Sequence, residues 1–193
     1  YSLSAYEHSP EIDGIVIVAP KERLENVKVM VQMFGCYKVK KIVAGATSRQ
    51  ASVMNGLKAL DENVTVVSIH DASRPNVTTE QVTETTKTAK RYGSGVLASR
   101  LSDAVKVVER GATVTQTLNG GTVWLVQTPQ AFKTDLILKG YESAQKKKES
   151  ISDDSEALRL IRADVHLVPN ERNSVRISGP MDLQIAEFLL RQP

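Results

Sequence analysis

The sequence predicts an α/β domain in which helices cover a parallel β-sheet. Four short β-branched runs lie at 15–18, 42–43, 65–69 and 96–98. Segments with helical patterns separate them, near 21–34, 48–60 and 79–92. Strands that alternate with helices are typical of parallel sheets, because the connection between two parallel strands is usually a helix.

The ends of these helices carry local signals. The motifs Thr47-x-x-Gln50 and Thr78-x-x-Gln81 both fit a capping box, in which two side chains bond the free backbone amides at a helix start. Gly35 and Gly93 stand where helices favour a terminal glycine. These signals support the helix boundaries that the alternation suggests.

The pattern changes between residues 100 and 127. Two alternating runs, 105–108 and 114–118, flank a turn at Gly111 with no helix between them. This pattern predicts an antiparallel hairpin, which we call the β-arm. An arm in an α/β domain often pairs subunits, and the alternative is a surface hairpin without a partner.

Helical sequence returns after the β-arm. We expect helices near 131–146 and 153–162, a strand at 165–168, and a last helix opened by Pro180. No repeat or linker divides the chain, so residues 1–193 are expected to form a single domain. We expect that domain to be incomplete at its N-terminus, because residues 1–8 resemble the inside of a helix whose cap lies upstream.

The overall composition excludes several classes of function. The net charge of +3 comes from 25 basic and 22 acidic residues, which is too weak a bias to indicate nucleic-acid binding. No apolar stretch approaches the roughly 20 residues of a membrane helix, so we expect a soluble protein without a membrane partner. Cys36 is the only cysteine, which excludes an internal disulfide and fits a reducing cytoplasm.

The loop after the third strand run is the first candidate site. Residues 70–75 follow a buried strand, and ligands of open parallel sheets bind beyond the carboxyl ends of strands. Asp71 can hold substrate hydroxyls or face a Mg²⁺ ion bound to phosphates, and Arg74 can orient Asp71 or an anion. The alternative is a loop held by an aspartate and a local ion pair.

Residues 45–52 form a second candidate site. They lie at the end of another strand run and open a helix, so free backbone donors and hydroxyls there can hold a phosphate or contact a base. The alternative is structural, with Thr47 capping the helix and the next turn exposed.

Three later segments have a functional and a structural interpretation. Thr128, with Pro129 and Gln130, can present its hydroxyl to a ligand or can simply lead into a helix. Ser152-Asp153-Asp154 resembles a metal-binding acidic pair, but two acids after a serine cap also suit the helix dipole. Arg176 lies in an alternating run at 175–178, which predicts a strand that points the arginine to one face or leaves it solvated.

Taken in order, these segments resemble one family, the 2-C-methyl-D-erythritol 4-phosphate cytidylyltransferases of the non-mevalonate isoprenoid pathway. The resemblance is carried by Gly45-x3-Arg49-x2-Ser52, HDASRP at 70–75, Asp103 with Lys106, WLVQTPQAF at 124–132, Ser152-Asp153-Asp154, and VRISGPMDL at 175–183. It implies a Rossmann-like nucleotidyltransferase fold with a protruding β-arm and a homodimer joined through that arm, at about 100–127. It also implies a Mg²⁺-dependent reaction in a bacterial cytoplasm or a plastid stroma.

The resemblance also assigns roles. In that family the phosphate of methylerythritol phosphate attacks the α-phosphorus of CTP and expels pyrophosphate, so catalysis comes from positioning and charge neutralisation. It implies that Arg176 and Asp71 are catalytic and that Asp71 is the residue a metal would contact. The implied nucleotide-binding residues are Ala46, Thr47, Ser52 and Ala72. The implied substrate-binding residues are Asp71, Arg74, Asp103, Thr128 and Ser152.

Four positions depart from the family pattern, and one of them is Arg100, which stands where a proline is usual. Arg176 replaces the usual lysine, which keeps the positive charge but changes its geometry. Gly120 stands at the arm position whose arginine positions the substrate phosphate in the partner's site, so a neighbour such as Arg100 or Arg110 would have to compensate. Ala104 stands where a threonine is usual.

The family's glycine-rich loop, whose arginine and lysine stabilise the transition state, aligns before Tyr1. We therefore expect these 193 residues alone to release little or no pyrophosphate. Two alternatives to the main interpretation stay open. One is a cytidylyltransferase for another polyol phosphate such as ribitol 5-phosphate, because the altered positions contact the acceptor. The other is a non-catalytic dimeric homologue.

Overall fold

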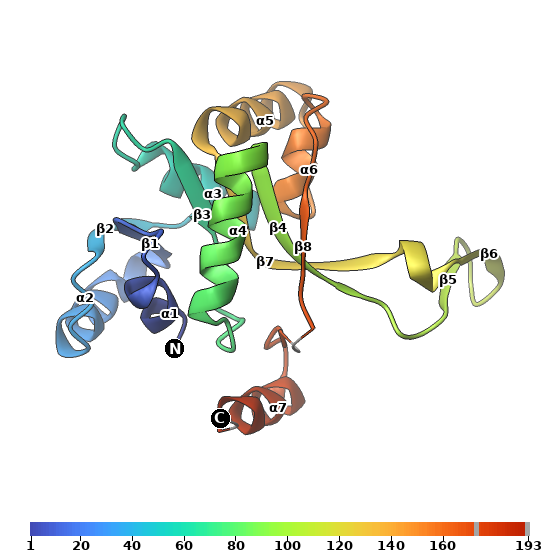
Figure 1. Ribbon diagram of the computed structural model, residues 1–193, viewed down its shortest axis with the longest axis horizontal. Helices are drawn as coiled ribbons and strands as arrows, with labels where there is room; N and C mark the ends of the chain where they lie inside the picture. The colour runs from blue at the N-terminus through green and yellow to red at the C-terminus, as the bar shows by residue number, and fades with distance from the viewer. Residues whose placement is uncertain (172–173, 192–193) are drawn as a thin grey trace.

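Three sheets organise the protein in this computed structural model, which describes residues 1–171 and 174–191. β1 (Ile15–Ala19) pairs with β2 (Val39–Ala44) in a two-stranded parallel sheet. A four-stranded sheet has the order β3-β7-β4-β8, and β5 pairs with β6 in the β-arm. The strands of the four-stranded sheet are β3 (Val66–Ile69), β4 (Ser94–Arg100), β7 (Trp124–Lys133) and β8 (Leu167–Pro169). Figure 1 shows this sheet at the centre of the body.

Helices cover both faces of the four-stranded sheet. The α-helices of the described residues are α1 (Ser2–His8), α2 (Leu24–Met33), α3 (Arg49–Lys58), α4 (Thr79–Tyr92), α5 (Thr134–Lys147), α6 (Asp154–Arg159) and α7 (Pro180–Leu190). Successive residues of a strand face opposite sides of the sheet. In β4, Gly95 lies against the α4 backbone, and its neighbour Val96 lies in a core cluster with residues of α3, α5 and α6. The predicted alternation of strands and helices is confirmed up to β4.

The predicted parallel sheet is found in part: β1 pairs parallel with β2 and β4 with β8, but β7 runs antiparallel to both β3 and β4. The segment Thr128-Pro129-Gln130 therefore lies inside a central strand and does not lead into a helix, and α5 begins at Thr134. The pairing of β7 with β4 is irregular between Val126 and Gln130. A proline, which has no N–H to donate, is tolerated in a strand at such an irregularity.

Of the two predicted capping boxes, only the second is present. Thr78 caps α4 with its partner Gln81, and Gly93 ends that helix with a positive φ of 97°. At α3 the N-cap is Ser48 and not Thr47, because the Ser48 side chain accepts from the Ala51 amide. Gln50 is not available for a box, since its side chain bonds Glu149 and Ile151 in the loop before α6.

The largest core cluster lies between the sheet and the helices α3, α5 and α6. Its buried members are Leu57, Val96, Phe132, Ile137, Tyr141, Ala157 and Leu158. A Cβ on Gly140 of α5 would stand 2.6 Å from the Ala157 carbonyl oxygen of α6, so only glycine allows this close approach of the two helices. The approach brings Tyr141 of α5 to the start of α6.

The predicted β-arm is confirmed. β5 (Val105–Val108) and β6 (Val114–Leu118) pair antiparallel, and Gly111 in the turn between them has a positive φ of 62°. Figure 1 shows the arm extending far from the body on the continuation of β4 and β7.

The C-terminal part follows the prediction except at residues 175–178. α6 and α7 form near the expected positions, and β8 covers the expected strand with a shift of about two residues along the chain, which is within the usual uncertainty of such boundaries. Residues 175–178 do not form a strand. Among the described residues they make a single backbone–backbone bond to another segment, from the Ile177 amide to the Ser73 carbonyl at 2.8 Å, and one bond does not make a ladder.

Candidate active site

The candidate site begins where β3 ends, in the loop that contains Asp71 and Arg74. The Asp71 amide donates to the Thr128 hydroxyl at 3.2 Å, which ties the loop to β7. The Arg74 amide donates to the Asp71 carbonyl at 2.9 Å, closing a tight turn. The backbone of Asp71 is therefore held by the central sheet.

The His70 side chain also joins this loop to β7, and its hydrogen bonds define which ring nitrogen carries the proton. Its Nε2 lies 3.2 Å from the Arg74 carbonyl oxygen, which can only accept, so Nε2 carries the proton. Nδ1 then accepts from the Thr128 hydroxyl at 3.0 Å, and that hydroxyl is left to accept from Asp71. Burial lowers the pKa of His70 to about 4, which keeps the ring neutral near pH 7.

Arg49, which belongs to the predicted site at 45–52 but was assigned no role there, lies at the centre of the cluster. Its Nε donates to Asp71 Oδ1 at 2.9 Å. Its Nη1 and Nη2 donate to the two carboxylate oxygens of Asp154 at 3.0 and 2.6 Å. The Tyr141 hydroxyl donates to the same Asp154 carboxylate. The sequence signal for Arg49 was its place in the motif Gly45-x3-Arg49-x2-Ser52, which follows a strand.

The charges of this cluster are coupled. Burial lowers the pKa of Arg49, but the hydrogen bonds and charges of Asp154 and Asp71 outweigh it, and the pKa is raised above its usual value. Burial, and then the charge of Asp154, raise the pKa of Tyr141. Arg49 is thus a permanent cation and Tyr141 a permanent hydroxyl donor at physiological pH.

The turn at 45–52 adjoins this cluster through Arg49, the first residue of α3. Ser52 Oγ accepts from the Ala46 amide at 2.9 Å and lies 2.8 Å from the Ser48 carbonyl. The Ser52 hydroxyl therefore shapes the turn from inside, while Ala46 and Thr47 are exposed. Ala72 is exposed in the neighbouring loop. The four predicted nucleotide-binding residues stay predictions, and the bond between Arg49 and Asp71 joins the two segments that carry them.

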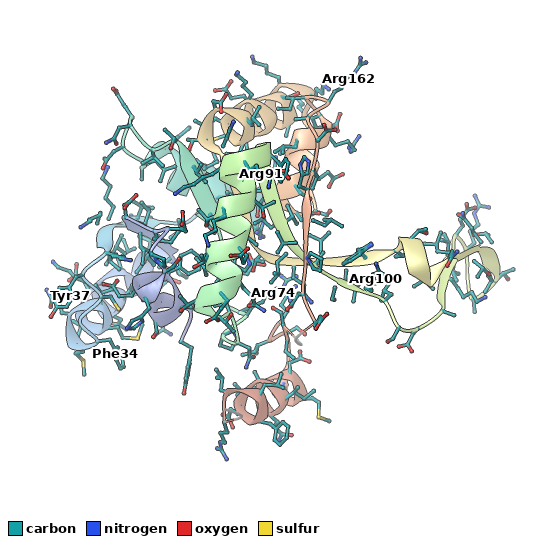
Figure 2. The ribbon with its side chains drawn as sticks, viewed as in Figure 1. Phe34, Tyr37, Arg74, Arg91, Arg100 and Arg162 are labelled. Carbon is teal, nitrogen blue, oxygen red and sulfur yellow. The ribbon has the colours of Figure 1, made fainter. Side chains whose placement is uncertain are left out.

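One prediction had Arg74 orient Asp71, but among the described residues it is the side chain of Arg49, and not that of Arg74, that bonds the Asp71 carboxylate. Arg74 Nη1 donates to the Ser174 carbonyl at 2.6 Å. Its Nε is buried without a hydrogen-bond partner among the described residues. Burial, together with the charge of the nearby Arg176, lowers the pKa of Arg74. Figure 2 shows Arg74 beside the N-terminal end of α4.

Two further predicted site residues, Arg176 and Ser152, lie in different places, near Arg74 and just before α6. Exposed Arg176 lies near Arg74, because the Ile177 amide joins its segment to Ser73. The amide and hydroxyl of Ser152 bond Glu156 at 2.8 and 3.0 Å. The cap of α6 is Asp153 and not Ser152, since the Asp153 carboxylate accepts from the Ser155 amide. Asp154 next to it serves Arg49, so the pair 153–154 has a structural explanation.

Asp103 and Gly120 lie at the base of the β-arm and outside this cluster. A Cβ on Gly120 would stand 3.6 Å from the Leu101 carbonyl oxygen and 3.7 Å from that of Asp103. Arg100 precedes Leu101, and its guanidinium carbon lies 5.1 Å from the centre of the Trp124 ring. Figure 2 shows Arg100 where the arm leaves the body. Arg110 is exposed at the far turn of the arm.

The donor set fits a metal ion only if a substrate supplies most of the ligands. Among residues 1–171 and 174–191 no three His, Cys, Asp or Glu side chains gather as a metal site. Asp71 uses Oδ1 for Arg49, and its Oδ2 has no hydrogen bond within the described part of the chain. One carboxylate oxygen beside phosphates is a usual environment for Mg²⁺.

Comparisons with known proteins decide the family. The family model for 2-C-methyl-D-erythritol 4-phosphate cytidylyltransferase matches residues 1–192. The chain belongs to this family. A cytidylyltransferase of that name from Pelotomaculum thermopropionicum is 35% identical over 190 residues, which are 98% of this chain and 80% of the relative. The one from Geobacter metallireducens is 35% identical over 195 residues, covering 99% and 84% of the two chains.

Solved structures of cytidylyltransferases agree with the fold. The 4-diphosphocytidyl-2C-methyl-D-erythritol synthase from Anaerococcus prevotii has a TM-score of 0.89 at 29% identity and covers 98% of this chain and 84% of its own. The cytidylyltransferase from Thermus thermophilus has a TM-score of 0.79 at 26% identity, with 99% and 87% covered. The predicted nucleotidyltransferase fold and enzyme class are confirmed. None of the described helices has the length and apolar character to cross a membrane.

Proposed function

We propose that this cytidylyltransferase transfers CMP from CTP to 2-C-methyl-D-erythritol 4-phosphate, giving 4-diphosphocytidyl-2-C-methyl-D-erythritol and pyrophosphate. The observation that carries the proposal is that Arg49 joins the turn at 45–52 to the loop of Asp71. The first is the predicted nucleotide site and the second the predicted acceptor site. Family membership supports both halves.

The reaction needs positioning and positive charge. An oxygen of the acceptor phosphate attacks the α-phosphorus of CTP and forms a new P–O bond, while the bond to the β-phosphate breaks and its electron pair leaves with pyrophosphate. Arg176 and Arg74 would neutralise the charge on the reacting phosphates. A buried donor without a partner is costly, and Arg74 Nε is such a donor among the described residues, so an oxygen-rich ligand suits this position.

Asp71 has two roles in this proposal. Its Oδ2 would bind an acceptor hydroxyl or contact Mg²⁺, and Thr128 would act mainly by holding the Asp71 amide. A bound Mg²⁺ ion would neutralise charge on the triphosphate. Ala46, Thr47 and Ala72 would border the cytidine through exposed backbone and side chain, and Ser52 would keep the turn in shape.

The acceptor is the part of the proposal with a specific competitor. Gly120 and Ala104 stand at positions that contact the acceptor in the family, so their change keeps a second candidate open, ribitol 5-phosphate. Of the two arginines that could replace the missing one, Arg100 adjoins Leu101 beside Gly120, whereas Arg110 lies at the far turn. We therefore propose Arg100 as the compensating charge.

Calorimetry separates the two acceptors. With Mg²⁺ present, we expect the 193-residue protein to bind CTP and to bind methylerythritol phosphate more tightly than ribitol 5-phosphate. The Asp71→Asn variant should weaken the binding of methylerythritol phosphate by about tenfold, because a charged hydrogen-bond acceptor is lost, with a smaller effect on CTP. Tighter binding of ribitol 5-phosphate would transfer the proposal to the second candidate.

We also propose a homodimer joined through the β-arm. Val108 and Val114 are opposite each other in the arm and are 44% and 50% exposed, and Leu125 of β7 is 50% exposed. Apolar side chains on an arm that extends into solvent suit an interface.

In sedimentation, we expect the wild-type protein to be a dimer and the Leu125→Asp variant to be a monomer. Tyr37→Asp, at an exposed position remote from the arm (Figure 2), should stay a dimer. A monomeric wild-type protein would contradict the proposal.

A further inference from the structure

Asp154 is a carboxylate with no exposed surface that lies at the first position of α6. A buried charge is tolerated only with a full set of partners. Here the partners are the two terminal nitrogens of Arg49 and the hydroxyl of Tyr141. Tyr141 is itself fully enclosed, at 1% exposure, on a helix packed closely against α6. The carboxylate and the hydroxyl therefore form a rigid anchor.

The anchor fixes the direction of the third donor of Arg49. A guanidinium group is planar, so bonding Nη1 and Nη2 to one carboxylate sets the direction in which the Nε–H bond points. That direction leads to Asp71 Oδ1, at 2.9 Å. The Asp71 carboxylate is held by Arg49, and its backbone is held separately by Thr128. Oδ1 is thus occupied, while Oδ2 has no hydrogen bond within the described part of the chain.

We propose that Arg49 is a positioning residue that orients the Asp71 carboxylate for its ligand, and that Asp154 and Tyr141 act on the site only through Arg49. Arg49 also offsets the negative charge of Asp71, which would otherwise repel a triphosphate and a phosphorylated acceptor. The role of Asp71 in acceptor binding rests on the proposed function. The orientation of Asp71 does not, and it can be tested without a ligand.

The test compares Arg49→Lys, Asp71→Asn and the double variant. Lysine keeps the charge, but a single ammonium group cannot bond both Asp154 oxygens and Asp71 in the same fork. We expect Arg49→Lys to weaken the binding of methylerythritol phosphate by about tenfold, close to the effect of Asp71→Asn. The double variant should bind within about twofold of Asp71→Asn alone, since Arg49 acts through Asp71.

Two further measurements separate positioning from general stability. Arg159→Lys makes the same substitution at an exposed α6 arginine that bonds only Glu149 and Glu156 among the described residues, and it should bind the acceptor as the wild type does. Tyr141→Phe, which removes only the hydroxyl, should weaken acceptor binding less than Arg49→Lys does. In crystal structures we expect the Asp71 carboxylate to leave its position in Arg49→Lys and to keep it in Arg159→Lys.

An Asp71 carboxylate that stays in place in Arg49→Lys would overturn the inference. So would a double variant whose loss is the product of the two single losses, because Arg49 would then act independently of Asp71. If the wild-type protein binds neither acceptor, the proposed function fails, and the crystal structures still decide whether Arg49 orients Asp71.

Discussion

Arg49→Ala is expected to cost about 3–5 kcal/mol of unfolding free energy, the usual cost of removing one partner from a buried ion pair. The substitution leaves the fully buried Asp154 with Tyr141 as its only remaining partner among those that the structure describes. It also removes the hydrogen bonds that join the start of α3 to Asp154 of α6. Urea unfolding at pH 7.5, followed by circular dichroism, measures the loss.

Two controls accompany this measurement. Lys41→Ala breaks an equally short ion pair with Asp61, but both side chains are well exposed, so we expect a change of about 1 kcal/mol or less. Adding Asp154→Asn to Arg49→Ala should recover part of the loss, because a neutral amide is less costly to bury than a lone carboxylate. A loss for Arg49→Ala as small as that of Lys41→Ala would show that the pair does not hold the site together.

The second large effect is expected on acidification, through His70. Its pKa is about 4 in the folded protein and 6.5 when unperturbed, so between these values the unfolded chain binds more protons than the folded one. The unfolding free energy should therefore be unaffected above about pH 7 and fall by about 3 kcal/mol as the pH approaches 4. Protonation would also place a proton on Nδ1, which now accepts from Thr128.

His70→Gln isolates this contribution. Glutamine can bond Thr128 and the Arg74 carbonyl but does not titrate, so the fall in stability between pH 7 and 4 should shrink by about 3 kcal/mol relative to the wild type. His8→Gln, at an exposed histidine of α1, serves as the matched control and should leave the pH profile unchanged. Parallel profiles for the wild type and His70→Gln would contradict the assignment.

The elements that were predicted correctly are stabilised by interactions between residues close to one another in the sequence. The box of Thr78 and Gln81 bonds within one helical turn, and Gly93 ends α4 through its own backbone conformation. Gly111 closes the β-arm in the same way. Each of these features depends on residues a few positions apart, so a single sequence contains the whole signal.

The missed elements depend on distant partners. β7 lies between β3 and β4, and its buried part includes the polar side chains of Gln127, Thr128 and Gln130. Those side chains form hydrogen bonds with residues of other segments. The spacing of apolar residues along the chain cannot show such bonds. Proline is disfavoured in a central strand, so Pro129 also made a strand here less expected. The irregular pairing with β4 accommodates it.

The same reason explains why the site was predicted as separate pieces. Asp71 and the turn at 45–52 were found because each follows a strand. Their link through Arg49 was not predicted, because Arg49 bonds Asp71 and Asp154, which are 22 and 105 residues away from it along the chain. The sequence alone also offered a sufficient explanation for Asp154, because an acidic residue at the start of a helix suits the helix dipole. Its burial, which decides its role, is a property of the packing of α5 against α6.

The most direct test of the proposed reaction is pyrophosphate release with CTP, Mg²⁺ and each acceptor. It is measured on the 193-residue protein and on the same chain carrying the glycine-rich loop of a cytidylyltransferase relative before Tyr1. We expect release with methylerythritol phosphate from the loop-bearing protein, at a rate well above that with ribitol 5-phosphate. Release confined to ribitol 5-phosphate, or none with either acceptor, would contradict it.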